Sequence, residues 1–400
     1  MSQQARNQGD ELGAKANSLR RSARGVWGVR RSTPQLDDDE RWMRRALELA
    51  ERGEGETNPN PMVGCVIVRG GRVVGEGYHR RAGGPHAEVE ALARAGTRAR
   101  GATLYVNLEP CSHLEKRTPP CVPQLVAAGV ARVVAAMRDP NPAVQGRGLA
   151  ALRRAGLEVS QGVLAAEARR LNERYVIAAE SERPFVLLKA ALTLDGRIAT
   201  AAGESKWITS ARQRGAARRL RRLHDGVAVG IGTVLADDPR LLPEPRVRRR
   251  FYRIVFDSRL RLPVRGRLAS TVGQGPVLVL TRSRDAARRR ALERLGVQVL
   301  VAPGAARGVV PIPWALAELR RLGLTSLMVE GGSELLGSFL AARAVDQLAL
   351  FRAPLLLGGR RSLPAFGGRD PRTLAEALRL RPRTGESLDY ELWDVPTARR

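Results

Sequence analysis

Short apolar runs alternate with amphipathic stretches along most of this chain. Residues 62–68 have the pattern of a buried strand, and Gly70-Gly71 predicts a hairpin turn into a second strand over residues 72–78. Helical spacing predicts helices over 37–50, 86–95 and 122–128, and apolar runs predict strands over 103–108 and 131–137. Strands that alternate with helices in this way indicate a layered α/β fold.

The same alternation resumes after Arg183-Pro184, which marks a boundary. Seven apolar runs predict strands over residues 185–191, 226–230, 253–257, 277–281, 297–301, 326–329 and 346–351. A chain of 400 residues is expected to form two or three domains of roughly 150 residues each. We therefore expect a disordered tail over residues 1–36, one α/β domain over 37–180 and a second over 183–395.

Residues 1–36 are polar and lack a periodic apolar face, which is typical of a disordered tail. They hold no apolar segment of a secretory signal. An organellar transit peptide is the alternative, but Asp10 and Glu11 count against it. No apolar run approaches the roughly 18 residues of a membrane span, so a soluble, cytoplasmic protein with no membrane partner is expected. Of the three cysteines, Cys65 lies in a predicted strand and is expected in the core.

The formal charge of +28 would ordinarily indicate a nucleic-acid partner. However, 64 of the 68 basic residues are arginine, although lysine also binds phosphate well, as a point charge. The arginines are spread over helical stretches such as residues 212–222, with no interleaved aromatic residues to stack on bases. Compositional drift together with a small anionic substrate explains the charge better, and we expect no nucleic-acid partner.

One histidine and two cysteines have the order of a zinc site: His86-Ala-Glu88, then Pro-Cys111 and Pro-Cys121. Three protein ligands leave the fourth tetrahedral position open for water, which is the arrangement of a catalytic zinc. Zinc lowers the pKa of that water toward neutrality. Glu88 is not a ligand and can carry a proton to a leaving amine. Each cysteine follows a proline and is expected near a helix start, where the helix dipole favours a thiolate.

This order, H-x-E…P-C…C, is the pattern of the zinc nucleobase deaminases. Cytidine and tRNA adenosine deaminases usually carry P-C-x-x-C, whereas nine residues, 112–120, separate the two cysteines here. With this insert, the motifs Thr57-Asn-Pro-Asn-Pro-Met-Val-Gly64 and Leu108-Glu-Pro-Cys-Ser-His113 resemble the bifunctional deaminase–reductase family of riboflavin biosynthesis, RibD. In that family the insert is one residue shorter, so residues 114–117 imply an altered loop beside a metal site that keeps its ligands.

The resemblance extends over roughly residues 40–390 and includes Lys189-Ala-Ala-Leu-Thr-Leu-Asp-Gly196 and Val329-Glu-Gly-Gly332. It implies a cytidine-deaminase-like three-layer α/β/α domain, followed by a dihydrofolate-reductase-like α/β domain that uses NADPH. The chain has no G-x-G-x-x-G fingerprint of a Rossmann domain, so NADPH is implied by the resemblance alone. Gly331-Gly332 between a predicted strand and helix could admit a pyrophosphate.

The resemblance also assigns individual residues of the second domain. It implies substrate contacts at Ser205, Arg221, Leu241 and Glu330, and cofactor contacts at Ala191, Trp207, Thr233, Asp237, Ser258 and Gly332. Lys189 and Asp237 are plausible polar helpers, and the guanidinium fork of Arg221 suits a phosphate. One departure affects the substrate phosphate: Glu244 stands where the family usually has an arginine. Arg246, two residues on, could reach the same phosphate.

The expected function has two steps. Zinc-dependent deamination of 2,5-diamino-6-(5-phosphoribosylamino)pyrimidin-4-one is followed by NADPH reduction of the ribosyl side chain to ribityl. A homo-oligomer, dimer or tetramer, is expected. The alternatives are a deaminase whose second domain has lost reduction, a nucleic-acid base deaminase, and an RNA-binding protein with a structural zinc. The long insert counts against a nucleic-acid deaminase, and Glu88 with three ligands counts against a structural zinc.

Overall fold

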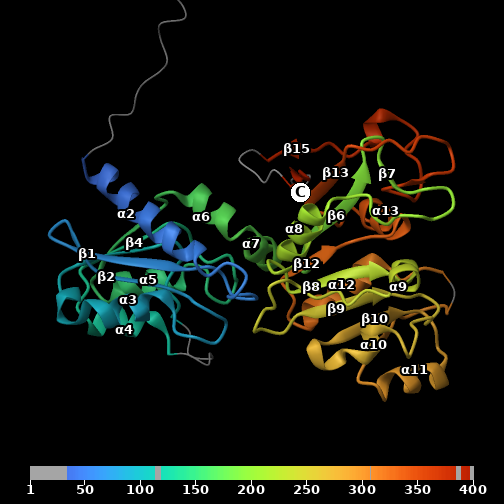
Figure 1. Cartoon of the computed structure of the whole chain (residues 1–400). Coiled ribbons are helices and arrows are strands. Elements are labelled where there is room, and N and C mark those ends of the chain that lie inside the picture. Colours follow the sequence, from blue (N-terminus) through green and yellow to red (C-terminus); the bar gives the residue numbers. More distant parts are fainter. Residues whose placement is uncertain (1–33, 113–118, 307, 384–388, 397–400) are drawn as a thin grey trace, which may run out of the picture. The chain divides into compact units, whose positions relative to one another are not determined.

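The computed structural model describes residues 34–112, 119–306, 308–383 and 389–396. The predicted tail over residues 1–36 lies almost wholly outside this part, and so does the altered loop predicted at residues 114–117. The described residues form a five-stranded sheet, a nine-stranded sheet and a small two-stranded sheet (Figure 1). No helix among them is long and apolar enough to cross a bilayer.

The five-stranded sheet has the order β2-β1-β3-β4-β5. Its strands are β1 (Gly64–Arg69), β2 (Arg72–Tyr78), β3 (Thr103–Val106), β4 (Arg132–Ala135) and β5 (Glu158–Gln161). The accompanying helices are α2 (Pro34–Glu51), α3 (Ala87–Ala95), α4 (Cys121–Ala127), α5 (Arg147–Arg154), α6 (Ala165–Leu171) and α7 (Glu173–Glu180). Strand β1 pairs antiparallel with β2 and β3, whereas β3, β4 and β5 run parallel.

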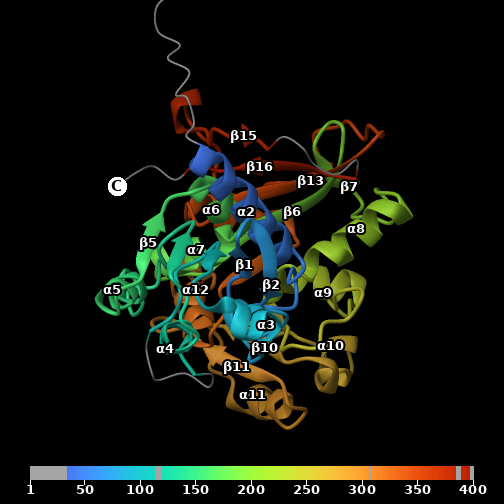
Figure 2. The ribbon, with the colours of Figure 1, turned by 90° about the vertical axis from the view of Figure 1, so that its left-hand side faces the viewer.

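This unit has three layers, because successive side chains of β1 point to opposite faces of the sheet and helices cover both faces. Cys65 and Ile67 face one side of the sheet and pack in the cluster that α3, α4 and α5 cover. Val66 and Val68 face the other side and pack with α2 and α6. Helices α2 and α3 lie on opposite sides of β1 and β2 in both views (Figures 1 and 2). The predicted α/β/α sandwich is therefore confirmed, and so is the core position of Cys65.

The nine-stranded sheet has the order β11-β10-β9-β8-β12-β6-β13-β16-β15. Its strands are β6 (Phe185–Thr193), β8 (Gly226–Gly230), β9 (Tyr252–Phe256), β10 (Val277–Thr281), β11 (Gln298–Val301), β12 (Ser326–Val329), β13 (Gln347–Ala353), β15 (Arg381–Pro382) and β16 (Glu391–Asp394). The seven predicted strands are all present, within two residues at each end, and they run parallel to their neighbours. Strands β15 and β16 form an antiparallel edge that the apolar pattern did not predict.

Helices cover both faces of this sheet. They are α8 (Ala211–Arg221), α9 (Ile231–Asp237), α10 (Arg267–Ser270), α11 (Ala286–Glu293), α12 (Ile312–Arg321) and α13 (Ser333–Ala341). Helices α12 and α13 pack on one face, and α8 to α11 pack on the other. The small sheet pairs β7 (Arg197–Ala199) with β14 (Leu363–Pro364). Both faces of the central strands are thus buried, which explains their nearly continuous apolar sequences.

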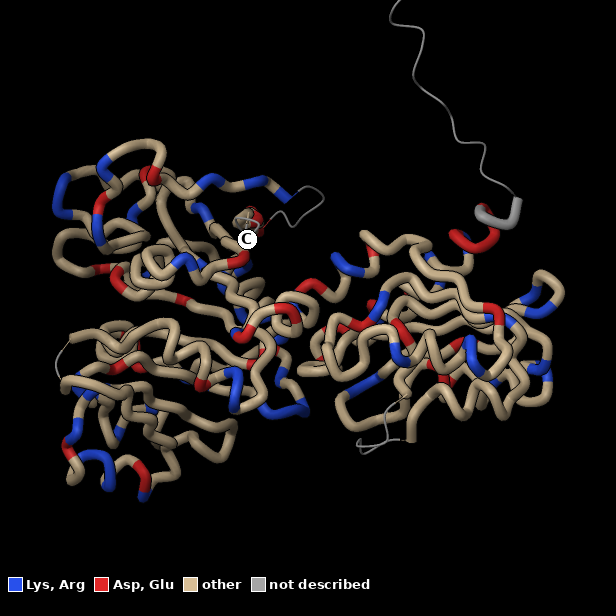
Figure 3. Tube along the Cα trace, turned by 180° about the vertical axis from the view of Figure 1, so that it is seen from behind, with Lys and Arg blue, Asp and Glu red and all other residues tan. Residues whose placement is uncertain are grey.

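Charged residues are distributed along the whole described chain. In Figure 3, Lys and Arg are scattered over helices and loops, with Asp and Glu between them. Many arginines are paired with carboxylates, as in the contacts of Arg45 with Glu76 and of Arg183 with Asp346. This distribution agrees with the compositional interpretation of the charge.

Candidate functional site

Three loops and helix ends bring the predicted metal ligands together. His86 is the N-cap residue of α3, Cys121 is the first residue of α4, and Cys111 lies in the segment that follows β3. The His86 Nδ1 atom is 3.2 Å from the Cys121 Sγ and 3.5 Å from the Cys111 Sγ, and the two sulfur atoms are 3.7 Å apart. All three ligand atoms lie within 4.8 Å of one another.

These separations fit a tetrahedral zinc ion. With Zn–S bonds of about 2.3 Å and a Zn–N bond of about 2.05 Å, tetrahedral angles place two sulfur atoms about 3.8 Å apart and a nitrogen about 3.6 Å from each sulfur. The observed spacings are within a few tenths of an ångström of these values. The three cysteines of the chain are all free thiols, so both sulfur atoms are available as ligands. Contacts with Cys121 and His86 lower the pKa of Cys111 to about 3, which favours the thiolate that a metal requires.

Both cysteines lie near the start of α4. Cys121 is its first residue, whereas Cys111 belongs to no described helix and meets the start of α4 from another segment. The Cys111 carbonyl oxygen instead accepts hydrogen bonds from the backbone N–H groups of Cys121 and Val122, each at 3.1 Å. The Cys111 segment therefore caps α4, because the first amides of a helix have no partner within it. This cap brings the two sulfur atoms together.

The predicted proton carrier lies beside the ligands. Glu88 is in the first turn of α3 and only 4% exposed, and its carboxyl group contacts the Cys121 thiol. Burial raises the pKa of Glu88. A second histidine, to which the sequence analysis gave no role, also lies beside the ligands. The ring of His79 lies edge-on to that of His86, with the centroids 5.7 Å apart.

Hydrogen bonds fix the orientation of His79. Its Nδ1 is 2.9 Å from the carbonyl oxygen of Pro85, and its Nε2 is 3.1 Å from Nδ2 of Asn60. Because a carbonyl can only accept, Nδ1 carries the proton and Nε2 accepts from the Asn60 amide. His79 thus connects Pro85, the residue before His86, with the Thr57-Asn-Pro-Asn-Pro segment through hydrogen bonds. This motif therefore lies beside the metal site.

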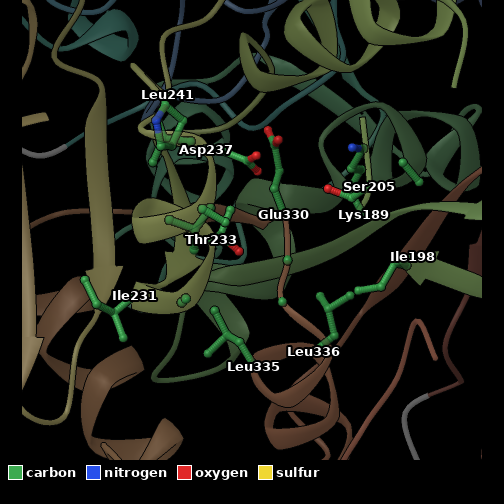
Figure 4. Close-up of a pocket in the computed structure, with 18 of the residues that line it drawn as sticks. Lys189, Ile198, Ser205, Ile231, Thr233, Asp237, Leu241, Glu330, Leu335 and Leu336 are labelled. Carbon is green, nitrogen blue, oxygen red and sulfur yellow. The ribbon is translucent and has the colours of Figure 1, made fainter. Parts of the chain in front are cut away.

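A cleft of ≈1480 Å³ opens in the second α/β unit. All eleven positions predicted there line it: Ala191, Ser205, Trp207, Arg221, Thr233, Asp237, Leu241, Arg246, Ser258, Glu330 and Gly332. They come from β6, α8, α9, the segment between β7 and α8, the segment between α9 and β9, and the segments that follow β9 and β12. Open parallel sheets bind ligands at the carboxyl ends of their strands. In Figure 4, Lys189, Ser205, Asp237 and Glu330 lie toward one side of the cleft, and apolar residues such as Leu335 and Leu336 lie toward the other.

A buried ion pair stands inside this cleft. Arg221 binds Glu330 with two parallel hydrogen bonds, of which the Nη2–Oε2 bond is 2.8 Å, and also donates to the Leu242 carbonyl at 2.9 Å. Their side chains are only 14% and 8% exposed. Burial opposes ionisation of Glu330, but Arg221 and Lys189 outweigh it and hold its pKa below the usual range. Burial also lowers the pKa of Lys189. The guanidinium fork predicted to hold a phosphate is thus engaged by a carboxylate.

The Glu244 departure has a local explanation. The Glu244 carboxylate pairs with Arg218, which lines the same cleft and neutralises it. Arg246 also lines the cleft, and its Nη2 donates to Gln274 Oε1 at 2.9 Å. Further arginines that the sequence analysis did not single out lie along the same walls: Arg214, Arg240, Arg259, Arg261 and Arg267. In so arginine-rich a chain, no pattern distinguishes them from solvated ones.

The segment after β12 is suited to bind the phosphates of a dinucleotide. Gly331 and Gly332 have φ angles of 133° and 68°, which favour glycine, and Gly332 is the N-cap of the nine-residue helix α13. The hydroxyl of Ser333, the first residue of α13, is buried and has no hydrogen-bond partner among the described residues. Free helix amides and an unpaired hydroxyl at the cleft are suited to phosphate oxygens. Across the cleft, Arg214 stacks on the exposed Trp207 ring at 4.2 Å, and Lys206 pairs with Asp237 at 3.0 Å.

Comparisons with known protein families match both units. Residues 36–137 match the cytidine and deoxycytidylate deaminase zinc-binding region, and residues 184–390 match the RibD C-terminal domain. The chain is 42% identical to riboflavin biosynthesis protein RibD of Aquifex aeolicus over 355 residues, covering 88% of this chain and 97% of that protein. It is 44% identical to RibD of Escherichia coli over 334 residues, covering 80% and 89%.

Solved structures agree over nearly the whole chain. RibD of Acinetobacter baumannii has a TM-score of 0.81 at 38% identity, covering 90% of this chain and 99% of that one. A diaminohydroxyphosphoribosylaminopyrimidine deaminase/5-amino-6-(5-phosphoribosylamino)uracil reductase from Thermotoga maritima has a TM-score of 0.77 at 35% identity, covering 90% and 98%. With a zinc-ligand triad in one unit and a lined cleft in the other, the chain belongs to the RibD family of riboflavin biosynthesis proteins.

Proposed function

We propose that this chain catalyses two consecutive reactions of riboflavin biosynthesis. Residues 37–180 deaminate 2,5-diamino-6-(5-phosphoribosylamino)pyrimidin-4-one, and residues 183–395 reduce the ribosyl side chain of the resulting 5-amino-6-(5-phosphoribosylamino)uracil to ribityl with NADPH. The observation that carries this proposal is the joint presence of three zinc ligands with a buried, non-ligand glutamate and a cleft lined by all eleven expected reductase positions. The similarity to RibD proteins over most of the chain supports it.

In the deaminase unit, His86, Cys111 and Cys121 would hold zinc through Nδ1 and the two Sγ atoms. When bound, zinc supplies an activated water as the nucleophile and stabilises the negative charge that develops. Glu88 accepts the proton of the attacking water on a carboxylate oxygen and passes it to the amino nitrogen that leaves as ammonia. Its burial keeps that proton from bulk solvent. His79 and Asn60 hold the ring of His86 and the neighbouring loop in place.

In the reductase unit, Gly332 with the start of α13, together with Ala191, Trp207, Thr233, Asp237 and Ser258, would hold the nucleotide. When bound, NADPH supplies the hydride for C1′ of the sugar. Ser205, Leu241 and Glu330 would contact the substrate. Lys189 lies partly buried beside Glu330 and is suited to supply a proton to the sugar, because desolvation lowers its pKa.

The substrate phosphate requires cations at the cleft. Glu330 binds Arg221 through two hydrogen bonds and so fixes the direction of the guanidinium group. Fewer N–H donors of Arg221 are then left for a phosphate. Arg246 has no carboxylate partner among the described residues and lines the cleft. We assign the phosphate to Arg246 with Arg221, in place of the arginine that Glu244 replaces. Since Arg218 pairs with Glu244, this carboxylate does not oppose the phosphate.

Two further assignments belong to this proposal. We place the enzyme in the cytoplasm, because two thiols 3.7 Å apart remain reduced ligands only in a reducing compartment. We also propose a homo-oligomer, a dimer or tetramer. Exposed leucines on adjoining segments support it: Leu194 donates its N–H to the Leu355 carbonyl, and Leu356 and Leu363 are exposed nearby along the chain. Light scattering of the purified protein gives its mass directly, and a monomer would contradict this part.

The experiment that tests the two-step function uses purified, zinc-loaded protein and the diaminopyrimidine phosphate. Ammonia release and NADPH oxidation at 340 nm are followed together. Glu88→Gln should lower ammonia release by about 10²- to 10⁴-fold and abolish NADPH oxidation with this substrate. The same variant should oxidise NADPH at the normal rate when given the deaminated intermediate. Ammonia without NADPH oxidation in the wild type would leave a deaminase only, and no ammonia would refute the proposal.

A further inference from the structure

Glu109 is a buried carboxylate that the mechanism above does not use. It is 4% exposed and stands two residues before the ligand Cys111. Its Oε1 accepts the backbone N–H groups of Gly148 and Leu149 at 2.8 and 3.2 Å. Its Oε2 accepts those of Gly146 and Asp139 at 2.9 and 3.2 Å. Among the described residues no lysine or arginine pairs with it, so four amides alone stabilise its charge.

These amides belong to the start of α5. Gly146 is the N-cap residue of α5, and Gly148 and Leu149 are its second and third residues. An N-cap side chain normally accepts the hydrogen bonds of those two amides, but glycine has no side chain to do so. Glu109 supplies the missing cap from another segment, and its negative charge suits the positive end of the helix.

The helix start also touches the metal-ligand segment directly. A Cβ atom added to Gly148 would lie 1.9 Å from the carbonyl oxygen of Pro110, the residue between Glu109 and Cys111. Only glycine permits this approach. On the other side, the Cys111 carbonyl caps α4, which carries the ligand Cys121. The short segment from Glu109 to Cys111 is thus attached at one end to α5 and at the other to α4.

We propose that Glu109 is a positioning residue of the deaminase, which sets the Cys111 sulfur at metal-binding distance by capping α5. The segment has no regular secondary structure of its own. Its position depends on these two caps and on one backbone hydrogen bond, from the Glu109 N–H to the Met137 carbonyl at 3.0 Å. Asp139 extends the attachment, since its N–H binds Glu109 and its carboxylate accepts the Tyr175 hydroxyl at 2.8 Å. This inference rests on the metal site of the proposed function.

The test is Glu109→Gln in the full-length protein. The amide keeps the size of the side chain, but whichever way it turns, its NH₂ group faces two backbone N–H donors and the cap is lost. Zinc affinity, measured by competition with a chromophoric chelator, should fall 10- to 100-fold, as is typical when a residue that orients a ligand is removed. With Co²⁺ in place of zinc, the visible bands that report tetrahedral thiolate coordination should shift or weaken.

Controls separate positioning from general damage. Glu158→Gln removes a carboxylate of the same unit, 70% exposed and paired with Arg132, and should leave zinc affinity and the cobalt spectrum unchanged. NADPH oxidation with the deaminated intermediate reports the second unit and should persist in Glu109→Gln. If Glu109→Gln does not fold, Glu109→Asp is measured in its place. It keeps the charge but reaches fewer amides, and its zinc affinity should fall by more than twofold and by up to about tenfold.

Two outcomes have different meanings. In the first, the wild type binds zinc, and the variant binds it within twofold of the wild-type affinity and gives the same cobalt spectrum. The variant here is Glu109→Gln, or Glu109→Asp if Glu109→Gln does not fold. This result would refute the positioning role and leave the metal site in place. If the wild type binds no zinc, or binds it equally well after Cys111→Ser, the proposed metal site itself fails.

Discussion

The buried ion pair between Arg221 and Glu330 allows a sharp prediction about charge in the reductase cleft. Glu330→Gln removes the carboxylate with almost no change in shape. Two cations, Arg221 and Lys189, then remain buried near each other without their counter-ion. Arg221→Met removes one cation instead, and the Glu330 carboxylate that remains still has the Lys189 ammonium beside it. The neutral substitution of the carboxylate should therefore destabilise the protein more than loss of the arginine.

The magnitude follows from burial. Removing one partner of a buried pair costs about 3–5 kcal/mol in the free energy of unfolding. Because the two side chains are at most 14% exposed, we expect Glu330→Gln in that range. Arg221→Met should cost about 1–3 kcal/mol, since hydrogen bonds are lost but no charge is left alone. The double variant should cost less than the sum of the single ones by about 2 kcal/mol. Arg221 is then no longer left beside Lys189 without a carboxylate, and the hydrogen bonds shared by Arg221 and Glu330 are lost only once.

Urea unfolding followed by tryptophan fluorescence measures these costs. Trp314 and Trp393 pack against the core of the nine-stranded sheet, so their emission reports its unfolding. With a slope of about 3 kcal/mol per molar urea, Glu330→Gln should lower the midpoint by about 1–1.7 M. Ammonia release should be unchanged in both variants below the transition, which serves as the control. A larger cost for Arg221→Met than for Glu330→Gln, or strict additivity in the double variant, would refute the charge argument.

Three further predictions concern pH, packing and the metal. Glu330 has its pKa held below the ordinary 4.5, so its stabilising effect is complete above about pH 4.5 and is lost as the pH falls below it. The stability difference between wild type and Glu330→Gln, from urea titrations, should be constant near neutrality and shrink in acid; a difference that grows in acid would contradict this. Gly64→Ala places a Cβ 2.0 Å from the Ala46 carbonyl, forces α2 away from β1, and should cost about 3 kcal/mol, seen as earlier thermal loss of ammonia release. Removing zinc with a chelator should abolish ammonia release but not NADPH oxidation with the deaminated intermediate; deamination by metal-free protein would exclude the proposed chemistry.

Local patterns were sufficient for the elements and for the metal ligands. The apolar runs of β6 and of β8 to β13 predicted strands, because strands buried on both faces have few polar residues. The His86-Ala-Glu88 motif predicted its chemistry because ligand and proton carrier both lie within one helical turn. The short strands β15 and β16 gave no such signal, since they lie at an edge and are partly exposed.

Long-range contacts decided the rest. No spacing connects Glu109 with Gly148, or Arg221 with Glu330, because these pairs are 39 and 109 residues apart and meet only when separate segments pack. The partner of an arginine is also undetermined by sequence when arginines are so numerous: Arg221 faces a carboxylate, Arg218 neutralises Glu244, and Arg246 lies at the cleft.

Sequence patterns predicted a zinc site, a proton carrier beside it and two layered α/β units. Residue type, order and apolar period are local properties, and they are sufficient to predict candidate ligands and the strands of two sheets. The tertiary structure alone decided how each group is held: the Cys111 segment by two helix caps, and Arg221 by a buried carboxylate. The reason is physical. Burial and hydrogen bonding set the charge and direction of a side chain, and both depend on neighbours distant in the sequence.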